Sequence, residues 1–378
     1  MANDALPEEW EILRGWLPED LDQYAREYEF FQRTRGLTDS ERWLRLILMH
    51  VAGGLSLEQT VLRARELGLA EVSGVALFKR LRRAEAWLRS LCQYLLKEQQ
   101  NRLGQCRWPN KYRVRAIDAT DVQEPGSTGS DWRIHYSIRL PELICDHYEV
   151  TDKHQGESFG RFEFKKDELI LADRGYSHWA GAAKVLASGA ALLMRWHSKA
   201  FPLQSVGKRA GKPFTVLEHL RRLPKHNAGE WQVQFVYERK VYRLRLCAIR
   251  KNRLAAERAR KKVQADAKAE GRQASPESLE QAEYVMVLTS LPAMFTCSQV
   301  LQLYRCRWQI ELAFKRLKTL MGAGHVPKID DQSARAWMQA KILTALLLER
   351  LLLEAKIFSP WGYRLSELEP VAFGARGT

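Results

Sequence analysis

Residues 168–176 have the sequence ELILADRGY, the clearest strand signal in the chain. Its first five residues have the length of a strand, and the apolar run 169–171 predicts burial on both faces of a sheet. Residues 177–188 are typical of a helix and residues 190–196 of another strand, so the stretch opens a β-α-β unit. Asp173 stands where the strand ends, which is the end at which α/β folds place their ligands.

Three strands are predicted before this unit, separated by turns that contain Gly, Ser or Pro: 114–122, 132–140 and 144–152. Three strands of antiparallel character followed by a β-α-β unit predict an α/β fold, in which helices cover a mixed sheet. The pattern after the unit predicts strands at 231–237, 241–249 and 285–289, a basic helix at 255–271, a polar linker at 273–278 and helices at 298–320 and 333–356.

Residues 1–105 are predicted to be mostly helical. Gly53-Gly54 and Gly68 separate three helical patterns, and Ser73 is a suitable N-cap for the third. Helix, short turn, helix is the outline of a helix-turn-helix. The third pattern carries one acid, Glu85, against five basic residues: Lys79, Arg80, Arg82, Arg83 and Arg89. Such a helix suits a DNA groove or backbone, and it equally suits the solvated face of a small helical domain.

The composition indicates a polyanionic partner. Lys and Arg number 60 against 45 Asp and Glu, which gives a net charge of +15. Nucleic acid and an anionic membrane both fit this surplus, as does a basic but otherwise ordinary enzyme. No uncharged apolar stretch reaches the length of a membrane span and the first ten residues do not form a secretory signal, so we expect no membrane partner. The six cysteines form no C-x-x-C pair, which favours a reducing cytoplasm over a zinc site or disulfide framework.

Asp118 is the first candidate for chemistry. An acid in the middle of a strand is disfavoured by β propensity. Alternation along the strand places Asp118 on one face with Ala116 and Thr120, and Asp121 on the other, so only one of the two acids can face a common site. The alternative is a strand-end acid that makes a turn, and this segment alone favours the alternative.

Asp173 and Glu311 are the other candidate acids. Asp173 lies at the end of its strand, where the alternative role is that of a helix N-cap. Glu311 shares a helical stripe with Tyr304, Arg307 and Lys318, at spacings of three, four and seven residues. One acid between two cations and a phenol suits a metal-binding group whose neighbours grip phosphates. A row of surface ion pairs is the alternative.

The four residues of this stripe, with all three spacings, resemble the Tyr-Arg-Glu-Lys motif of insertion-sequence transposases of the IS-four group, which includes the Tn-five enzyme. Asp118-Ala119-Thr120 is similar to the first catalytic Asp of that family, and Asp173-Arg174-Gly175-Tyr176 to the second. The resemblance covers about residues 110–325. Trp308 matches an aromatic with which the family holds a flipped base, and packing in the core is its alternative role.

The resemblance implies an RNase H-like core with a β-rich insertion between the second Asp and the Glu. The expected division is a helical, helix-turn-helix-like domain at 1–105, two parts of the core at 106–199 and 284–357, the insertion with its basic helix at 200–283, and a tail at 358–378. Asp118, Asp173 and Glu311 are the implied catalytic and metal-binding triad for two Mg²⁺ ions, which Mn²⁺ can replace. Tyr304, Arg307, Trp308 and Lys318 are the implied DNA-binding residues.

The resemblance also implies cut-and-paste transposition. Water attacks the phosphodiester at a terminal inverted repeat and frees a 3′-hydroxyl, which then attacks the opposite strand, giving a hairpin, or target DNA. Double-stranded DNA, a homodimer in a synaptic complex, and the bacterial cytoplasm at the nucleoid are the expected partners and location. Two alternatives are a nuclease of the same fold that cleaves without joining and a DNA-binding protein that has lost catalysis.

Overall fold

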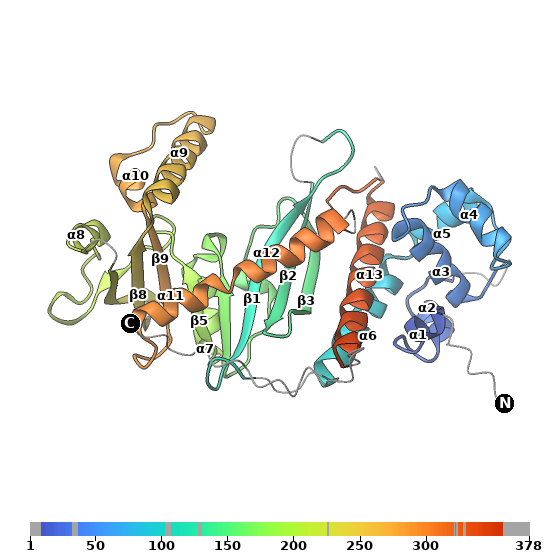
Figure 1. Cartoon of the computed structure of the whole chain (residues 1–378), viewed down its shortest axis with the longest axis horizontal. Helices are drawn as coiled ribbons and strands as arrows, with labels where there is room; N and C mark the ends of the chain where they lie inside the picture. Colours follow the sequence, from blue (N-terminus) through green and yellow to red (C-terminus); the bar gives the residue numbers. More distant parts are fainter. Residues whose placement is uncertain are drawn as a thin grey trace, which may run out of the picture.

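A computed structural model describes residues 9–31, 37–102, 107–127, 131–224, 227–320, 322, 324–327 and 330–357. The predicted tail at 358–378 lies outside these residues. One mixed sheet of nine strands runs through the described molecule, with helices on both faces and a helical region at one end (Figure 1). No helix among these residues is long and apolar enough to cross a lipid bilayer.

The first five strands of the sheet follow the order β3-β2-β1-β4-β5. Their bounds are β1 (Arg113–Val122), β2 (Trp132–Leu140), β3 (Ile144–Asp152), β4 (Glu168–Ala172) and β5 (Ala191–Arg195). The pairs β1–β2 and β2–β3 are antiparallel, whereas β4 lies parallel to both β1 and β5. The mixed α/β sheet predicted from the sequence is therefore confirmed.

The remaining strands extend the same sheet beyond β5 in the order β9-β8-β7-β6, all antiparallel. They are β6 (Gln204–Ser205), β7 (Ala228–Tyr237), β8 (Lys240–Arg250) and β9 (Tyr284–Thr289). Because β9 pairs with both β5 and β8, the strands that follow the second Asp are joined edge to edge to the first five. A single continuous sheet therefore contains both the first five strands and the strands that follow Asp173.

Alternating side chains divide the core between the two faces of the sheet, because successive side chains of a strand point in opposite directions. Leu169 and Leu171 belong to one hydrophobic cluster, whereas Ile170 and Ala172 belong to the other. The first cluster includes residues of the N-terminal region and of the last three helices, and the second includes α7 (Trp179–Ala187) and α8 (Val216–Arg221). Burial of β4 on both faces, as predicted, follows from this double layer.

The N-terminal region is helical, as predicted. Its helices are α1 (Glu9–Arg14), α2 (Leu21–Glu27), α3 (Ser40–Val51), α4 (Leu57–Glu66), α5 (Gly74–Arg82) and α6 (Glu85–Arg102). Asp39, Ser56 and Ser73 cap α3, α4 and α5 with side-chain hydrogen bonds. The predicted third helix is interrupted at Arg83-Ala84, after which α6 begins and packs along the last helix of the chain (Figure 1).

Two helices connect β8 to β9 and lie beyond one end of these strands: α9 (Arg253–Ala269) and α10 (Pro276–Ala282) (Figure 1). The basic helix was predicted. The prediction of a linker through residue 278 was wrong, because Ser275 caps α10 with its side chain and Pro276 occupies its first turn.

The predicted helix 298–320 is two helices and a π-helical turn: α11 (Cys297–Arg305), α12 (Trp308–Lys315) and 316–320. The break has a local cause, since the amides of Cys306 and Arg307 bond to carbonyls three residues back instead of four. Both helices still run across one face of the sheet along nearly one line (Figure 1). The last helix, α13 (Asp331–Ile357), was predicted within two residues at its start.

Candidate active site

The two aspartates come from adjacent parallel strands. Ile117 of β1 is the register partner of Ala172 of β4, so the next residue along each chain places Asp118 beside Asp173. Both side chains point to the sheet face over which α11 and α12 run, because they share the parity of Ala116 and Leu171 in the first hydrophobic cluster. Local alternation and parallel pairing therefore bring the two acids together.

Arg307 lies between the three predicted acids. Its Nη1 is 3.1 Å from Asp118 Oδ2, its Nε is 4.0 Å from Asp173 Oδ1, and its Nη2 is 2.5 Å from Glu311 Oε1. Tyr304 completes the group, since its hydroxyl donates a 3.1 Å hydrogen bond to Asp173 Oδ1. Five of the seven residues predicted for the site thus form one connected cluster.

The contacts in this cluster bear on the alternative roles that the sequence left open. Asp173 precedes a short 3-10 turn without capping it and instead accepts from Tyr304, so the N-cap role is not observed. Asp121, on the opposite parity from Asp118, pairs with Arg133 at 2.9 Å. Glu311 does form a helical ion pair with Arg307 and its side chain is 57% exposed, yet the same guanidinium also contacts both aspartates.

The carboxyl group of Asp118 has a strongly shifted pKa. Burial raises the pKa of Asp118 to about 7, against the opposing effects of the Ala119 amide and of Arg307, while the nearby carboxylates of Asp173 and Glu157 raise it further. Burial also raises the pKa of the Tyr304 hydroxyl, so this phenol remains a hydrogen-bond donor at neutral pH. Carboxylates that crowd around one cation are the oxygen ligands that Mg²⁺ prefers, so these residues fit a divalent metal site.

A fourth acid, Glu157, borders the site and was not predicted. A Cβ atom on Gly175 would lie only 1.4 Å from Glu157 Oε2, so the glycine leaves the space that this carboxylate fills. Burial and the charges of Asp173 and Asp121 raise the pKa of Glu157. Its sequence context, a loop after β3, carries no pattern that could have identified it.

The two other predicted residues lie beside the cluster. Trp308 is 50% exposed, so it does not pack in the core. With Tyr304 and Arg307 it lines a cavity of about 610 Å³, whose other lining residues are Arg195, Lys251, Val285 and Arg305. Lys318 is exposed in the π-helical turn and lines a separate hollow with Asp121, Gln123, Gly324 and His325.

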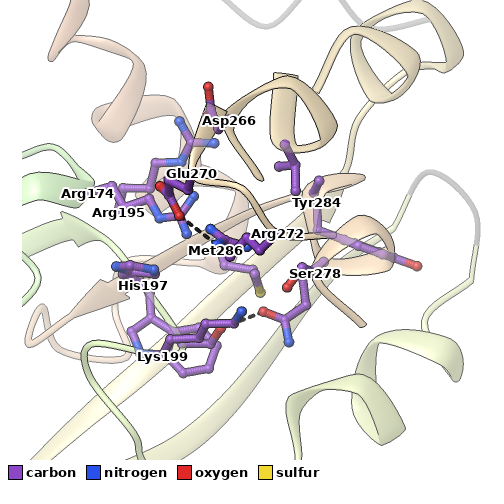
Figure 2. A pocket seen from close by; sticks show the side chains of 15 residues that line it. Arg174, Arg195, His197, Lys199, Asp266, Glu270, Arg272, Ser278, Tyr284 and Met286 are labelled. Carbon is purple, nitrogen blue, oxygen red and sulfur yellow. Dashed lines mark hydrogen bonds and ion pairs between the residues drawn. The ribbon is translucent and has the colours of Figure 1, made fainter. Parts of the chain in front are cut away.

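A basic cavity of about 320 Å³ continues beyond Arg195, between the sheet and the helices α9 and α10 (Figure 2). Its cationic lining residues include Arg174, Arg195, Lys199 and Arg272. Of these, only Arg272 forms an ion pair with an acid of the described chain, Glu270. The positive charges of Arg174 and Arg195 repel each other: burial and the charge of Arg195 both lower the pKa of Arg174. Two acids, Asp266 and Glu270, also line this cavity, so its four basic residues leave a net positive charge that favours an anionic ligand.

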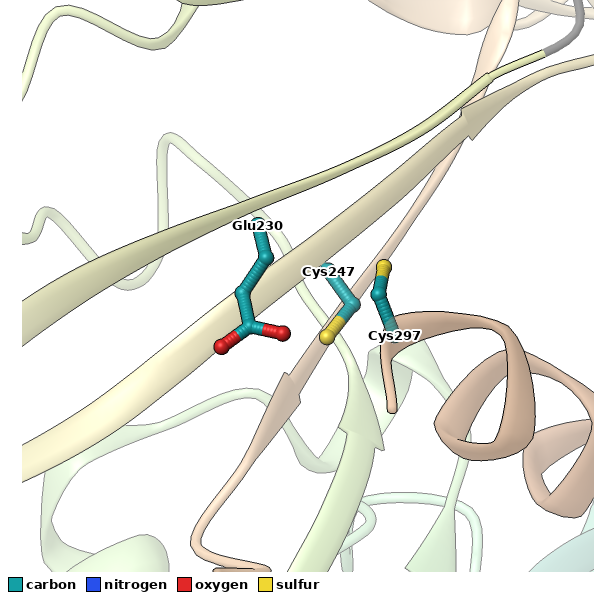
Figure 3. A group of neighbouring side chains, drawn as sticks. All are labelled: Glu230, Cys247 and Cys297. Carbon is teal, nitrogen blue, oxygen red and sulfur yellow. The ribbon is translucent and has the colours of Figure 1, made fainter. Parts of the chain in front are cut away.

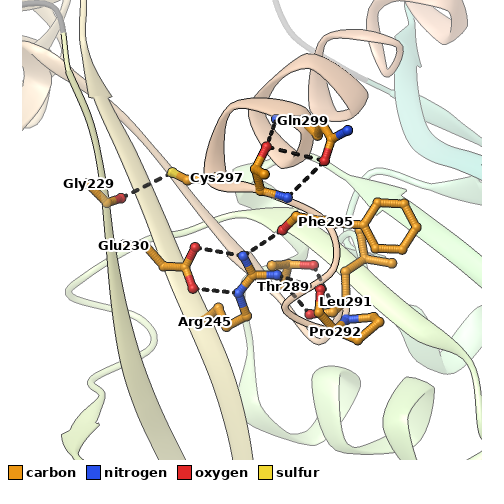
Figure 4. A network of polar contacts seen from close by, with 10 residues as sticks. Gly229, Glu230, Arg245, Thr289, Leu291, Pro292, Phe295, Cys297 and Gln299 are labelled. Carbon is orange, nitrogen blue, oxygen red and sulfur yellow. Dashed lines mark hydrogen bonds and ion pairs between the residues drawn. The ribbon is translucent and has the colours of Figure 1, made fainter.

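Another cluster of potential metal ligands lies at the start of α11, where Glu230, Cys247 and Cys297 bring their ligand atoms within 4.8 Å of one another (Figure 3). Arg245 takes both oxygens of Glu230, at 2.7 and 2.6 Å, and also donates to the backbone carbonyls of Leu291, Pro292 and Phe295 (Figure 4). With Glu230 engaged, the cluster is a structural network that fastens the loop before α11 to β7 and β8.

The family of the chain follows from comparison with known proteins. A family model described as Transposase DDE domain matches residues 109–348, and the chain belongs to this family of enzymes of the nuclease and transesterification class. It is 33% identical over 360 residues to the InsL protein of insertion sequence element IS186A from Escherichia coli (strain K12), covering 91% of this chain and 93% of that one. It is also 33% identical over 361 residues to the transposase for insertion sequence element IS421 from Escherichia coli, with the same coverage. The resemblance noted from the Tyr-Arg-Glu-Lys motif is thereby confirmed.

Among solved structures, the chain is similar to a piggyBac transposase in a synaptic complex with hairpin DNA. The TM-score is 0.46 at 11% sequence identity, and the match covers 92% of this chain and 73% of the other.

Proposed function

We propose that the chain is a cut-and-paste transposase that cleaves the ends of its own insertion sequence at terminal inverted repeats and joins them to target DNA. The observation that carries the proposal is the convergence of Asp118, Asp173 and Glu311 on the single guanidinium of Arg307. The strand order β3-β2-β1-β4-β5, with the first three strands antiparallel, supports an RNase H-like core around these acids.

In this proposal the three carboxylates hold two Mg²⁺ ions, for which Mn²⁺ can substitute. Such ions activate the attacking oxygen and stabilise the leaving oxygen of a phosphodiester. The protein residues do the positioning. Tyr304 fixes one oxygen of Asp173 through its hydroxyl, and the buried setting of Asp118 keeps bulk water away from its carboxylate.

DNA recognition is assigned to Tyr304, Arg307, Trp308 and Lys318, together with the basic cavity of Figure 2. Arg307 matches a phosphate with its planar fork, Lys318 offers a point charge in solvent, and Trp308 offers an exposed ring on which a base can stack. Three exposed basic residues are assigned to the terminal repeat: Lys79 of α5, Arg83 directly after α5, and Arg89 of α6.

The proposal includes the domain division given by the sequence, in which 200–283 is an insertion in a core formed by 106–199 and 284–357, after the helical domain 1–105. It also includes a homodimer on paired DNA ends and a location in the bacterial cytoplasm at the nucleoid. The five cysteines in the described part of the chain are all free thiols, which fits a reducing compartment.

The test is incubation of the full chain with Mg²⁺ and DNA that carries the element's own ends, with products resolved strand by strand. Cleavage at the repeat followed by joined product supports the proposal. Cleavage without any joined product would favour the nuclease alternative, and tight binding without cleavage the inactive DNA-binding protein. The intact cluster of three acids argues against the second alternative.

A further inference from the structure

We infer that Arg307 couples DNA binding to divalent cation binding: it holds the three catalytic carboxylates in the free protein and releases them when a DNA phosphate takes its guanidinium. The inference rests on the proposed function and adds an order of events to it. It follows from the position of Arg307, which contacts all three acids at once.

The first step of the argument is competition for the same oxygens. Arg307 engages Asp118 Oδ2, Asp173 Oδ1 and Glu311 Oε1, and a divalent cation coordinated by these residues needs carboxylate oxygens from the same set. The guanidinium is positively charged at any accessible pH and only 13% exposed, so it cannot vacate the site by losing a proton. The guanidinium and a divalent cation therefore oppose each other in the free protein.

The second step is that a DNA phosphate offers the guanidinium of Arg307 an alternative partner. Besides touching the acids, Arg307 lines the cavity of about 610 Å³ with Lys251, Arg195 and Trp308. Lys251 donates to the Ala282 carbonyl, and among the described residues neither it nor Arg195 forms an ion pair with an acid, so this cavity is a favourable place for a phosphate. Burial, Arg195 and Arg174 lower the pKa of Lys251 to about 8, an effect that a bound anion would reverse. A phosphate bound in this cavity accepts two hydrogen bonds from the planar guanidinium of Arg307, which then no longer contacts the carboxylates.

The third step is thermodynamic. If a phosphate removes Arg307 from the three carboxylates, DNA raises the affinity of the protein for the divalent cation. The divalent cation must then raise the affinity for DNA by the same factor. Coupling between two sites commonly lies between roughly 5-fold and 150-fold. Until DNA arrives, Arg307 also neutralises acids that would otherwise repel one another. The free protein thus keeps its catalytic acids together with low affinity for the cation.

The experiment measures Mn²⁺ binding by the electron paramagnetic resonance signal of the free ion, with and without duplex DNA of the element's end, after subtraction of binding to DNA alone. In the wild-type chain, DNA should tighten Mn²⁺ binding by at least about 5-fold. Arg307→Gln should bind Mn²⁺ more tightly than wild type without DNA, and DNA should add little further. Arg307→Lys, which cannot span three carboxylates, should fall between the two.

The matched control is Lys315→Gln, which removes one positive charge from an exposed side chain of α12 that does not line this cavity and forms no ion pair with the three acids. It should retain both the weak Mn²⁺ binding and the tightening by DNA. Equal tightening by DNA in Arg307→Gln and wild type, with Arg307→Lys behaving likewise and all melting curves intact, would overturn the inference alone. If wild type binds Mn²⁺ no better than Asp118→Asn under any condition, the proposed function falls with it.

Discussion

Arg307 and Asp118 are 189 residues apart in the chain, yet Nη1 of the arginine donates to Oδ2 of the aspartate at 3.1 Å. This contact joins the helix pair α11–α12 to the centre of the sheet, and it makes Asp118 the acid of β1 that faces the site. Asp121 points the other way and pairs with Arg133. The two aspartates therefore provide a matched pair for mutation.

Asp118→Asn should abolish cleavage of end DNA, because the amide removes a charged ligand oxygen while keeping the shape of the side chain. DNA binding should survive, since no phosphate contact is assigned to this residue. Strand-resolved cleavage assays and a mobility shift measure the two effects. Asp121→Asn is the control and should still cleave; strong cleavage by Asp118→Asn would refute its assignment.

Lys318→Ala should leave the melting temperature nearly unchanged, because the side chain is exposed in the turn after α12. Binding to pre-cleaved end DNA should weaken, and the slope of log affinity against log salt should fall by about one unit for one lost phosphate contact. Lys315→Ala, another exposed lysine of the same segment, is the control and should keep the wild-type slope. An unchanged slope for Lys318→Ala would contradict its role.

The basic residues at the end of α5 should separate into two kinds. Lys79 and Arg83 are exposed, so the double change to Gln should lower the preference for terminal-repeat DNA over scrambled DNA without loss of stability. Arg80 donates to the Phe30 carbonyl at 2.9 Å and lies over the rings of Phe31 and Trp43. Arg80→Gln should therefore cost roughly 1–2 kcal/mol of stability. Competition binding and denaturation measure both; an unaltered preference in the double variant would count against this surface.

Glu349 should make stability depend on pH. Burial raises the pKa of this carboxyl to about 7, although it accepts hydrogen bonds from the Cys145 amide and the Tyr136 hydroxyl. Because the folded-state pKa lies above that of an unfolded glutamate, this contribution to stability is complete below about pH 4 and is lost as pH rises to about 7. The loss amounts to roughly 3 kcal/mol.

Glu349→Gln should flatten that part of the stability profile, since an amide can accept from the Cys145 amide and donate to the Tyr136 hydroxyl at any pH. Denaturant titrations at a series of pH values measure the difference. Exposed Glu66→Gln is the control and should keep the wild-type profile. A profile for Glu349→Gln as steep as that of wild type would show that this carboxyl is already ionised in the folded chain.

The sheet and the acids could be predicted because they rest on short-range patterns. The apolar run before Asp173 and the alternation around Asp118 specify strands whose register then places the acids side by side. Glu157 could not be found this way, because its loop meets Gly175 only through tertiary packing. Helical spacing likewise could not reveal the tight turn at Cys306, where three-residue hydrogen bonds shift the phase of the stripe.

The pairing of α6 with α13 has a consequence for synthesis. Gln99 of α6 donates to the Leu346 carbonyl and Cys92 to the Gln339 carbonyl, so an early helix is completed by the last described one. A ribosome releases α6 and both aspartates well before Glu311 and α13. A chain that stops before α13 therefore leaves an apolar face of α6 uncovered, and one that stops before residue 311 also lacks the third acid of the proposed triad. We expect such interrupted products, whose α6 lacks its partner helix, to be targets for proteolysis.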